Sequence, residues 1–357
     1  MIRLEDLGWN DFFARQIGVE DRSRYTLFRV AEEQKNQYRV VSDVGEFWAE
    51  VSGKLRHEAS GRADFPAVGD WVCVQSRPGE ERATIHRVLA RKTKFSRQAA
   101  GAVTGEQIVA ANVDTAFVVT SLNRDLNARR VERALILIWE SGATPVVVLN
   151  KADLCPDAFD MAREIESAAA GVDVHIVSAL ENRGLDGLQS YLTRGKTAVL
   201  FGSSGVGKST LVNALAGEEV LEVQAVRDDD DRGRHTTTHR QLIRLPTGGM
   251  IIDTPGVREL QLWEGDEGLG QAFDDIEQLA GECRFSDCHH KSEPGCAIKQ
   301  ALQNGALELE RYQSYLTLQR EVAFHANRRA YAERSENRKR KLNSKAWFKH
   351  LSPNSER

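Results

Sequence analysis

The sequence predicts a multidomain chain with an N-terminal OB-type β-barrel, a central α/β domain and a C-terminal α-helical, metal-binding domain. Three observations predict this order: five short β-type runs, a stretch in which strands alternate with helices, and a cysteine and histidine cluster after the strands end. The expected division is an N-terminal extension over 1–24, the barrel over 25–108, the α/β domain over 109–275, and the metal-binding domain with a basic helical tail over 276–357.

The barrel segment combines β-type patterning with a small excess of positive charge. Several of its runs alternate apolar with polar residues, and turns such as Val44-Gly45 separate them. Five strands in about 75 residues suit an OB-type barrel, a fold that often binds nucleic acid. A structural barrel with solvated charges and an RNA-binding barrel are both compatible with this pattern. The runs are Tyr25–Val30, Tyr38–Ser42, Phe47–Val51, Trp71–Gln75 and Thr84–Leu89.

From Asp114 onward, apolar strands alternate with helices. Strands that are apolar on both faces predict a parallel sheet with helices on each side. The expected strands are Ala116–Thr120, Pro145–Leu149, Val174–Val177, Thr197–Phe201 and Met250–Ile252. The expected helices are Ala128–Trp139, Asp160–Ala169, Leu185–Leu192 and Ser209–Leu215, and a long, increasingly basic helical segment follows over Leu307–Lys341.

A glycine-rich loop with a phosphate-binding pattern lies between an expected strand and an expected helix. Gly202, Ser203, Ser204, Gly205, Val206, Gly207, Lys208 and Ser209 match G-x-x-x-x-G-K-[ST] in the required context. The backbone N–H groups of such a loop surround phosphates, and the helix N-terminus adds positive potential. We expect Lys208 to reach the β- and γ-phosphates as a catalytic group, Ser209 to ligate Mg²⁺, and Thr210 to adjoin the nucleotide.

A guanine-reading sequence follows the expected strand Pro145–Leu149. The Asp153 carboxylate can accept hydrogen bonds from N1–H and N2–H₂ of guanine, whereas adenine would leave it unpaired. Lys151 can cover the base, and Asn150 can hold the two loops together. Backbone N–H groups after the next strand are candidates for guanine O6. The predicted residues are Asn150, Lys151, Ala152 and Asp153 in the first segment, and Ser178 and Ala179 in the second.

The third candidate loop, Asp253-Thr254-Pro255-Gly256, follows Met250–Ile252. We expect Asp253 to hold Mg²⁺ through water and the Gly256 N–H to bind the γ-phosphate. Thr236 or Thr237 is expected to complete the Mg²⁺ shell. The position of the glutamine that orients water in Ras-like enzymes is Val257, which cannot hydrogen-bond to water. His235 and His239 are candidate substitutes, and surface histidines in a mobile loop are the alternative.

The nucleotide-binding segments occur in an unusual order, because the guanine reader precedes the phosphate loop. With Thr120-Ser121-Leu122-Asn123, the segment from Glu106 to Asp114 and Gly233-Arg234-His235-Thr236-Thr237-Thr238, this order resembles the RsgA family of circularly permuted GTPases. The resemblance covers about residues 25–330. It implies an OB domain, a permuted GTPase domain, a zinc domain, and GTP hydrolysis stimulated by the small ribosomal subunit during its maturation.

Cys283, Cys288, His290 and Cys296 supply three thiolates and an imidazole, a closed donor set for one structural Zn²⁺. The spacing also matches the resembled family and favours His290 over His289. The chain leaving Asp253–Gly256 leads directly to this cluster, so the nucleotide state is expected to act on it through that connection. Cys73 lies in an apolar strand and is expected in the core.

Charge and composition set limits on the partners. The chain has 357 residues, 28% charged and 41% hydrophobic, which excludes wholesale disorder. No uncharged run approaches the roughly 18 residues of a membrane helix. Residues 1–10 lack the apolar stretch of a secretory signal, so we expect a cytoplasmic, monomeric protein without a membrane partner.

The net charge of −4 argues against an RNA partner only if the charge is evenly spread. Residues 320–350 contain ten Lys plus Arg and three Asp plus Glu, and residues 21–100 contain 15 and 11. Both flanks are therefore positive. A basic tail of this kind can bind ribosomal RNA phosphates, or be a solvated helix. The candidate contacts are Arg328, Arg329, Arg334, Arg338, Lys339, Arg340 and Lys341.

Two function classes follow. The first is a Mg²⁺-dependent GTPase that binds the small subunit and couples stimulated hydrolysis to late maturation and to its own release. The second is an RNA-binding regulatory module for which GTP and GDP are conformational ligands with little turnover, an option that Val257 leaves open. An ATPase conflicts with Asp153.

Overall fold

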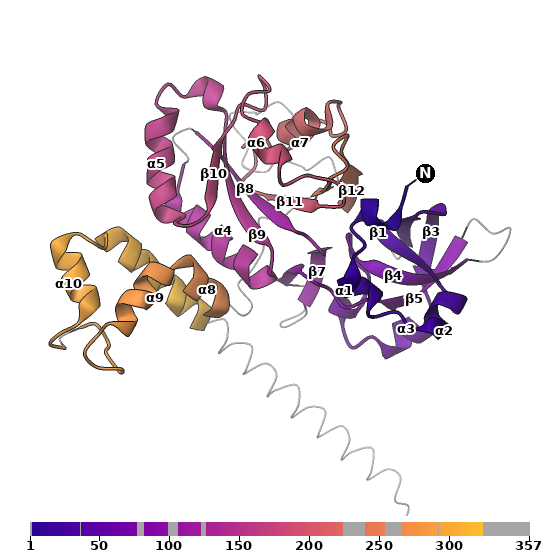
Figure 1. The fold of residues 1–357 in the computed structure, drawn as a ribbon, viewed down its shortest axis with the longest axis horizontal. Coiled ribbons are helices and arrows are strands. Elements are labelled where there is room, and N and C mark those ends of the chain that lie inside the picture. The colour runs from indigo at the N-terminus through magenta and orange to yellow at the C-terminus, as the bar shows by residue number, and fades with distance from the viewer. Residues whose placement is uncertain are drawn as a thin grey trace, which may run out of the picture.

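The computed structural model describes residues 2–35, 37–76, 82–98, 106–122, 126–223, 240–253, 266–291 and 293–323. Within these ranges the barrel and the helical domain lie at opposite ends of the molecule, with the α/β domain between them (Figure 1). None of the helices described has the length and apolar character needed to cross a membrane.

The predicted OB-type barrel is confirmed. Its strands pair in the order β1-β2-β3-β5-β4, and β4 pairs back with β1, which closes the barrel. The β3–β5 pair is parallel and the other pairs are antiparallel. Phe28, Val40, Val72 and Ile85 are fully buried inside it. The elements are β1 Thr26–Gln34, β2 Gln37–Ser42, β3 Gly45–Val51, α3 Gly53–Glu58, the 3₁₀ turn η2 Arg62–Asp64, β4 Trp71–Ser76 and β5 Arg82–Val88.

The α/β domain contains the predicted parallel sheet, in the order β10-β9-β8-β11-β13. An additional strand, β12, runs antiparallel to β13 and pairs on its other edge with β1 of the barrel. The two domains therefore share one continuous 11-stranded sheet among the described residues. The strands are β8 Thr115–Ser121, β9 Thr144–Asn150, β10 Asp173–Ile176, β11 Thr197–Phe201, β12 Arg240–Arg244 and β13 Met250–Asp253.

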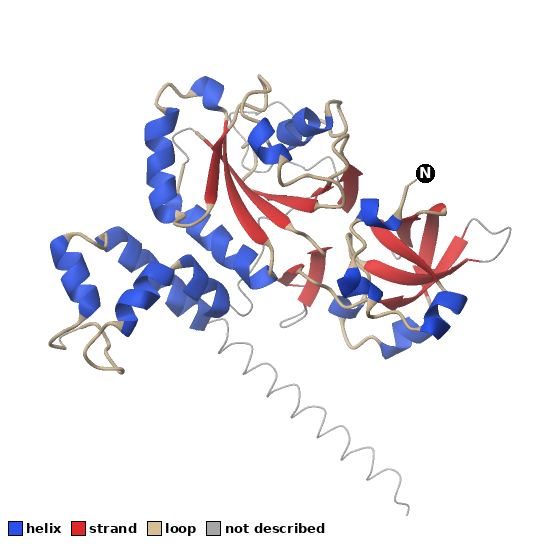
Figure 2. Cartoon of the chain, in the orientation of Figure 1, coloured by secondary structure: helices blue, strands red, loops and turns tan. Residues whose placement is uncertain are grey.

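Helices cover both faces of this sheet (Figure 2). Successive strand residues alternate between two cores, so Val118 packs with the α4 and α5 side and Val119 with the α6 and α7 side. The expected helix Leu185–Leu192 is shorter in the structure, where α6 is a single turn that follows Gly184, whose φ is +75°. The helices are α4 Ala128–Ser141, α5 Ala158–Ala168, α6 Asp186–Gln189 and α7 Lys208–Ala216.

The first 24 residues cover the junction between the barrel and the α/β domain. Leu7 and Phe13 are buried there, and Trp9 lies edge-on to Trp71 with ring centroids 4.8 Å apart. No local sequence pattern indicates a packing role for this segment. Its elements are η1 Leu4–Leu7, α1 Asp11–Ala14 and α2 Val19–Arg24, and the hairpin β6 Lys94–Gln98 with β7 Glu106–Ala111 leads from the barrel into the α/β domain.

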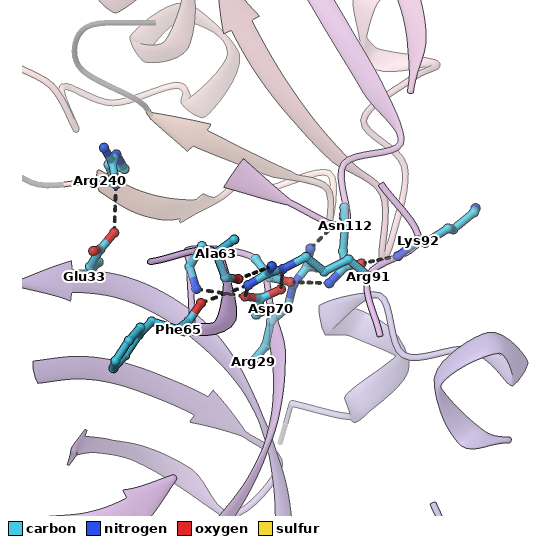
Figure 3. A network of polar contacts seen from close by, with 11 residues as sticks. Arg29, Glu33, Ala63, Phe65, Asp70, Arg91, Lys92, Asn112 and Arg240 are labelled. Atoms are coloured by element: carbon cyan, nitrogen blue, oxygen red, sulfur yellow. Dashed lines mark hydrogen bonds and ion pairs between the residues drawn. The ribbon is translucent and has the colours of Figure 1, made fainter. Parts of the chain in front are cut away.

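A fully buried arginine lies at the centre of this junction (Figure 3). Arg29 of β1 donates to three carbonyls, those of Leu7, Gly69 and Asn112, which come from three separate segments. Burial lowers the pKa of Arg29 to about 10, so the side chain stays charged at neutral pH. Beside it, Asp70 binds Arg91 through both carboxylate oxygens.

Replacing Arg29 by methionine is expected to destabilise the junction by about 3 kcal/mol or more, because the buried carbonyls of Leu7 and Asn112 lose their donor and that of Gly69 keeps only Asn112 Nδ2. Arg39→Met is the matched control, since Arg39 lies in a half-exposed ion pair with Glu32; we expect a loss below about 1 kcal/mol. Urea unfolding followed by tryptophan fluorescence measures both, because Trp9 and Trp71 lie in the junction. Equal losses would contradict the role of Arg29.

The C-terminal helices form a separate core against α4. Leu269, Phe273, Ile298 and Leu318 pack together and contact Ile136 of α4. Helix α8 lies before the predicted boundary at residue 275 but packs within this core. The elements are α8 Asp266–Ala272, α9 Asp274–Gly281, α10 Ala297–Asn304 and a helical stretch over residues 309–323.

A buried ionic cluster attaches this domain to the α/β domain. Arg311 lies 3.4 Å from the Glu132 carboxylate of α4 and binds both oxygens of Asp275 at 2.7 and 2.8 Å. The Ser314 hydroxyl also donates to Glu132, whose pKa is raised by burial. The helical domain is thus held by side-chain contacts as well as by the chain connection expected from sequence.

Candidate nucleotide-binding site and metal centre

The phosphate-binding pattern forms the connection between β11 and α7, as predicted. Two of its glycines have no room for a side chain. A Cβ at Gly202 (φ +149°) would lie 2.2 Å from the Val119 carbonyl oxygen, and one at Gly207 (φ +92°) would lie 2.4 Å from Asn150 Nδ2. The loop is therefore packed tightly against the ends of β8 and β9, and this packing requires glycine.

Lys208 opens α7 and turns back over the loop. Its Nζ donates to the carbonyls of Gly202 at 2.8 Å and Ser203 at 2.7 Å. Ser209 and Thr210 follow in the first turn of α7, and both are half-buried. The ammonium and the first turn of the helix therefore lie at the same end of the loop, where bound phosphate would meet both positive groups.

Asn150 joins three segments of the candidate site. Its Nδ2 donates to the Val206 carbonyl at 2.9 Å, and its Oδ1 accepts from the Ala179 N–H at 3.0 Å. The side chain is 2% exposed. The expectation that Asn150 holds loops together agrees with these contacts. The structure adds the third segment, since the Ala179 N–H, a candidate for guanine O6, donates here to Asn150.

The side chain of Asp153, close to these Asn150 contacts, is fixed by a hydrogen bond from Ser178. Asp153 lies in the 3₁₀ turn η3 Ala152–Leu154, which Lys151 enters with φ +64°. The Ser178 hydroxyl donates to Asp153 Oδ1 at 2.5 Å, and the Ala152 N–H donates to the Val177 carbonyl. Ser178 therefore orients the carboxylate, a role that the sequence pattern did not indicate.

Asp253 ends β13 at the same edge of the sheet. Burial raises the pKa of its carboxyl, and the nearby charge of Lys208 opposes that shift. A cation in this position would favour the ionised carboxylate further. Gly256, Val257, His235, His239, Thr236 and Thr237 lie outside the described residues, as does the acidic run from Asp228 to Asp231.

The four predicted zinc ligands converge between α9 and α10. Ligand atoms of Cys283, Cys288, His290 and Cys296 all lie within 4.8 Å of one another. His290 adopts φ +56°, which turns its ring toward the thiols, and its neighbour His289 is not part of the group. Cys73 is buried in the barrel as expected, and Cys155 is half-buried with its sulfur 3.4 Å from that of Met161.

The spacing of these atoms fits a tetrahedral metal ion. With zinc–sulfur bonds of about 2.3 Å, two thiolates of a tetrahedron lie about 3.8 Å apart. Cys283 and Cys296 sulfurs are 3.9 Å apart, and His290 Nδ1 is 3.6 and 3.4 Å from them. Three sulfurs and one nitrogen are donors that zinc prefers, and no position is left open for a reacting water.

Comparisons with known proteins agree with this arrangement. Residues 88–263 match the model of the RsgA GTPase family. The small ribosomal subunit biogenesis GTPase RsgA 2 of Lactiplantibacillus plantarum is 47% identical over 311 residues, which are 87% of each chain. Its namesake in Listeria monocytogenes is 42% identical over 349 residues, 98% of each chain.

The chain belongs to the RsgA family. Two solved structures share the permuted architecture of this family. YjeQ from Thermotoga maritima superposes with a TM-score of 0.62 at 29% identity, covering 83% of this chain and 98% of that one. YloQ, described as a circularly permuted GTPase, gives 0.59 at 25% identity and covers 84% and 96%. The predicted order of domains is thereby confirmed.

Proposed function

We propose that this chain is a GTPase of small ribosomal subunit biogenesis, whose hydrolysis of GTP is stimulated by the subunit and coupled to late maturation and to release. The observation that carries the proposal is the Asn150 junction, which joins the guanine reader to the phosphate loop in a member of the RsgA family. Chain order does not alter a site assembled in space, so permutation preserves the pocket.

Each described residue has a role that follows from its position. Asp153, oriented by Ser178, accepts from the guanine edge, and Lys151 covers the base. Lys208 neutralises charge on the transferred phosphoryl group, and loop N–H groups bind the phosphate oxygens. Ser209 and Asp253 would hold Mg²⁺, with Thr236 or Thr237 proposed as a further ligand. The metal supplies charge neutralisation between the β- and γ-phosphates.

The helical domain would take one structural zinc ion, for which the four converging ligands provide the support. We further propose that the barrel and the basic tail contact ribosomal RNA, and that the protein acts as a cytoplasmic monomer. The seven tail residues from Arg328 to Lys341 lie outside the described residues, so their contacts stay a prediction.

The deciding experiment is GTP turnover with and without purified small subunits. We expect stimulation of at least about tenfold, because a partner that completes a poor active site contributes more than that in related GTPases. ATP in place of GTP is expected to give no turnover, and large subunits no stimulation. Tight GTP binding without stimulated turnover would favour the alternative of a regulatory ligand, and ATP turnover would refute the guanine assignment.

A further inference from the structure

Strand β1 divides its length between two neighbours. Residues 26–29 pair with β4 and close the barrel, whereas Glu32 and Glu33 pair with Gln241 and Arg240 of β12. The register of β1 against β2 shifts between Val30 and Glu32, and such a bulge turns a strand away from its first partner. A barrel strand is therefore also an immediate neighbour of the α/β sheet.

The contact between β1 and β12 is short, and an ion pair reinforces it. Within the described residues two residue pairs form the β1–β12 ladder, whereas four residue pairs join β12 to β13. Arg240 Nη1 lies 2.8 Å from Glu33 Oε2, and the two side chains are 13% and 22% exposed (Figure 3). Partial burial reduces screening by salt and desolvates both groups, so removing one partner would leave a poorly solvated charge beside this short ladder.

The surroundings of Arg240 make Glu33 important to it. Arg62 of the barrel and Arg97 of β6 both act on Arg240 as like charges, and Glu33 is its hydrogen-bonded acid. Removing the Glu33 charge would leave these arginines to repel one another across the junction. The junction would then lose an attraction while the existing repulsion would stay unbalanced.

One row of residues connects the junction to the nucleotide site. Gln241 pairs with Glu32 of the barrel on one side and with Asp253 on the other. The ladder between β13 and β11 ends at Ile252, one residue before Asp253. At Asp253 the paired neighbour is therefore β12, and the position of β12 affects the position of this carboxylate.

We propose that Glu33 is a positioning residue for GTP hydrolysis, which acts through Arg240 and β12 on Asp253 and thereby couples the placement of the barrel to the nucleotide site. The inference rests on the proposed function, since it assigns to the barrel the transmission of the subunit's stimulation. A subunit that binds the barrel would act on Asp253 through three adjacent strands.

The test uses the full chain with Glu33→Gln, Arg240→Gln and the exchanged pair Glu33→Arg with Arg240→Glu. The control is Lys54→Gln, because Lys54 pairs with Glu58 within α3 of the barrel, and neither residue belongs to the β1–β12 ladder. Three quantities are measured: the Mg²⁺ dependence of binding of a fluorescent GTP analogue, and the kcat and the half-saturating subunit concentration of stimulated hydrolysis.

The single variants are expected to need about three- to tenfold more Mg²⁺ and to lose a similar factor in stimulated kcat, with subunit half-saturation within about twofold. The exchanged pair is expected to recover most of both. Unchanged Mg²⁺ dependence in the single variants, or no recovery in the exchanged pair, would overturn the coupling. The Mg²⁺ titration needs no subunit, so a failure of the proposed function itself shows separately, as absent stimulation of the unmodified chain.

Discussion

Replacing Asp153 by asparagine is expected to weaken GTP binding about 100-fold or more, because two charge-assisted hydrogen bonds to the guanine edge are lost. The same variant is expected to bind and hydrolyse xanthosine triphosphate, since the asparagine amide can donate to the carbonyl that replaces the guanine amino group. Both nucleotides are compared in equilibrium binding and in turnover with small subunits present.

The matched control for this prediction is Asp157→Asn. Asp157 lies four residues further on, is exposed, and makes no side-chain cap to α5. The Asp157→Asn substitution removes the same charge from the same region. It should leave the affinities for GTP and for xanthosine triphosphate as they are in the unmodified chain. An Asp153→Asn variant that kept its preference for GTP over xanthosine triphosphate would show that the base is read elsewhere.

Replacing Cys296 by serine is expected to remove the metal from the helical domain and to unfold that domain. Structural zinc contributes on the order of 10 kcal/mol to small zinc domains at neutral pH, because the unfolded chain has no formed site. Cys296 is buried and directly precedes α10, so loss of the ion should release that helix. Metal analysis should fall from one zinc per chain to nearly none, with protease cleavage within residues 266–323.

Cys155→Ser serves as the control thiol. Cys155 lies in the α/β domain, outside the four-ligand group, and its sulfur lies 3.4 Å from that of Met161. This variant should keep one equivalent of zinc and the cleavage pattern of the unmodified chain. Full zinc content in Cys296→Ser would contradict the assignment of the site.

The parts of the site that could be predicted are those built from short sequence segments. The phosphate loop, the Asn150–Asp153 segment and the four metal ligands each occupy few residues. Their residue types and spacing were therefore enough to predict what each could bind. Strand and helix positions followed from hydrophobic periodicity, as for Thr197–Phe201, where the expected and observed bounds coincide.

What the sequence did not reveal depends on contacts between distant segments. The burial of Arg29 depends on carbonyls of Leu7 and Asn112, and no local pattern distinguishes it from a surface arginine. Strand β12 is short and charged at both ends; it pairs with the nearby strand β13, and its other edge meets β1, more than 200 residues earlier in the chain. The two adjacent apolar residues Leu242 and Ile243 were the available signal for it.

The position of the N-terminal segment at the domain junction constrains the order in which the parts of the chain can fold. The barrel strands lie within residues 26–88 and pair with one another, so the barrel can close early in synthesis. Leu7 is buried in a core that includes Met250, and Gly8 approaches the Gly195 carbonyl. Residues 4–14 are synthesised before the barrel strands and yet are among the last to find their partners, so the closing of this junction requires that the α/β domain has folded.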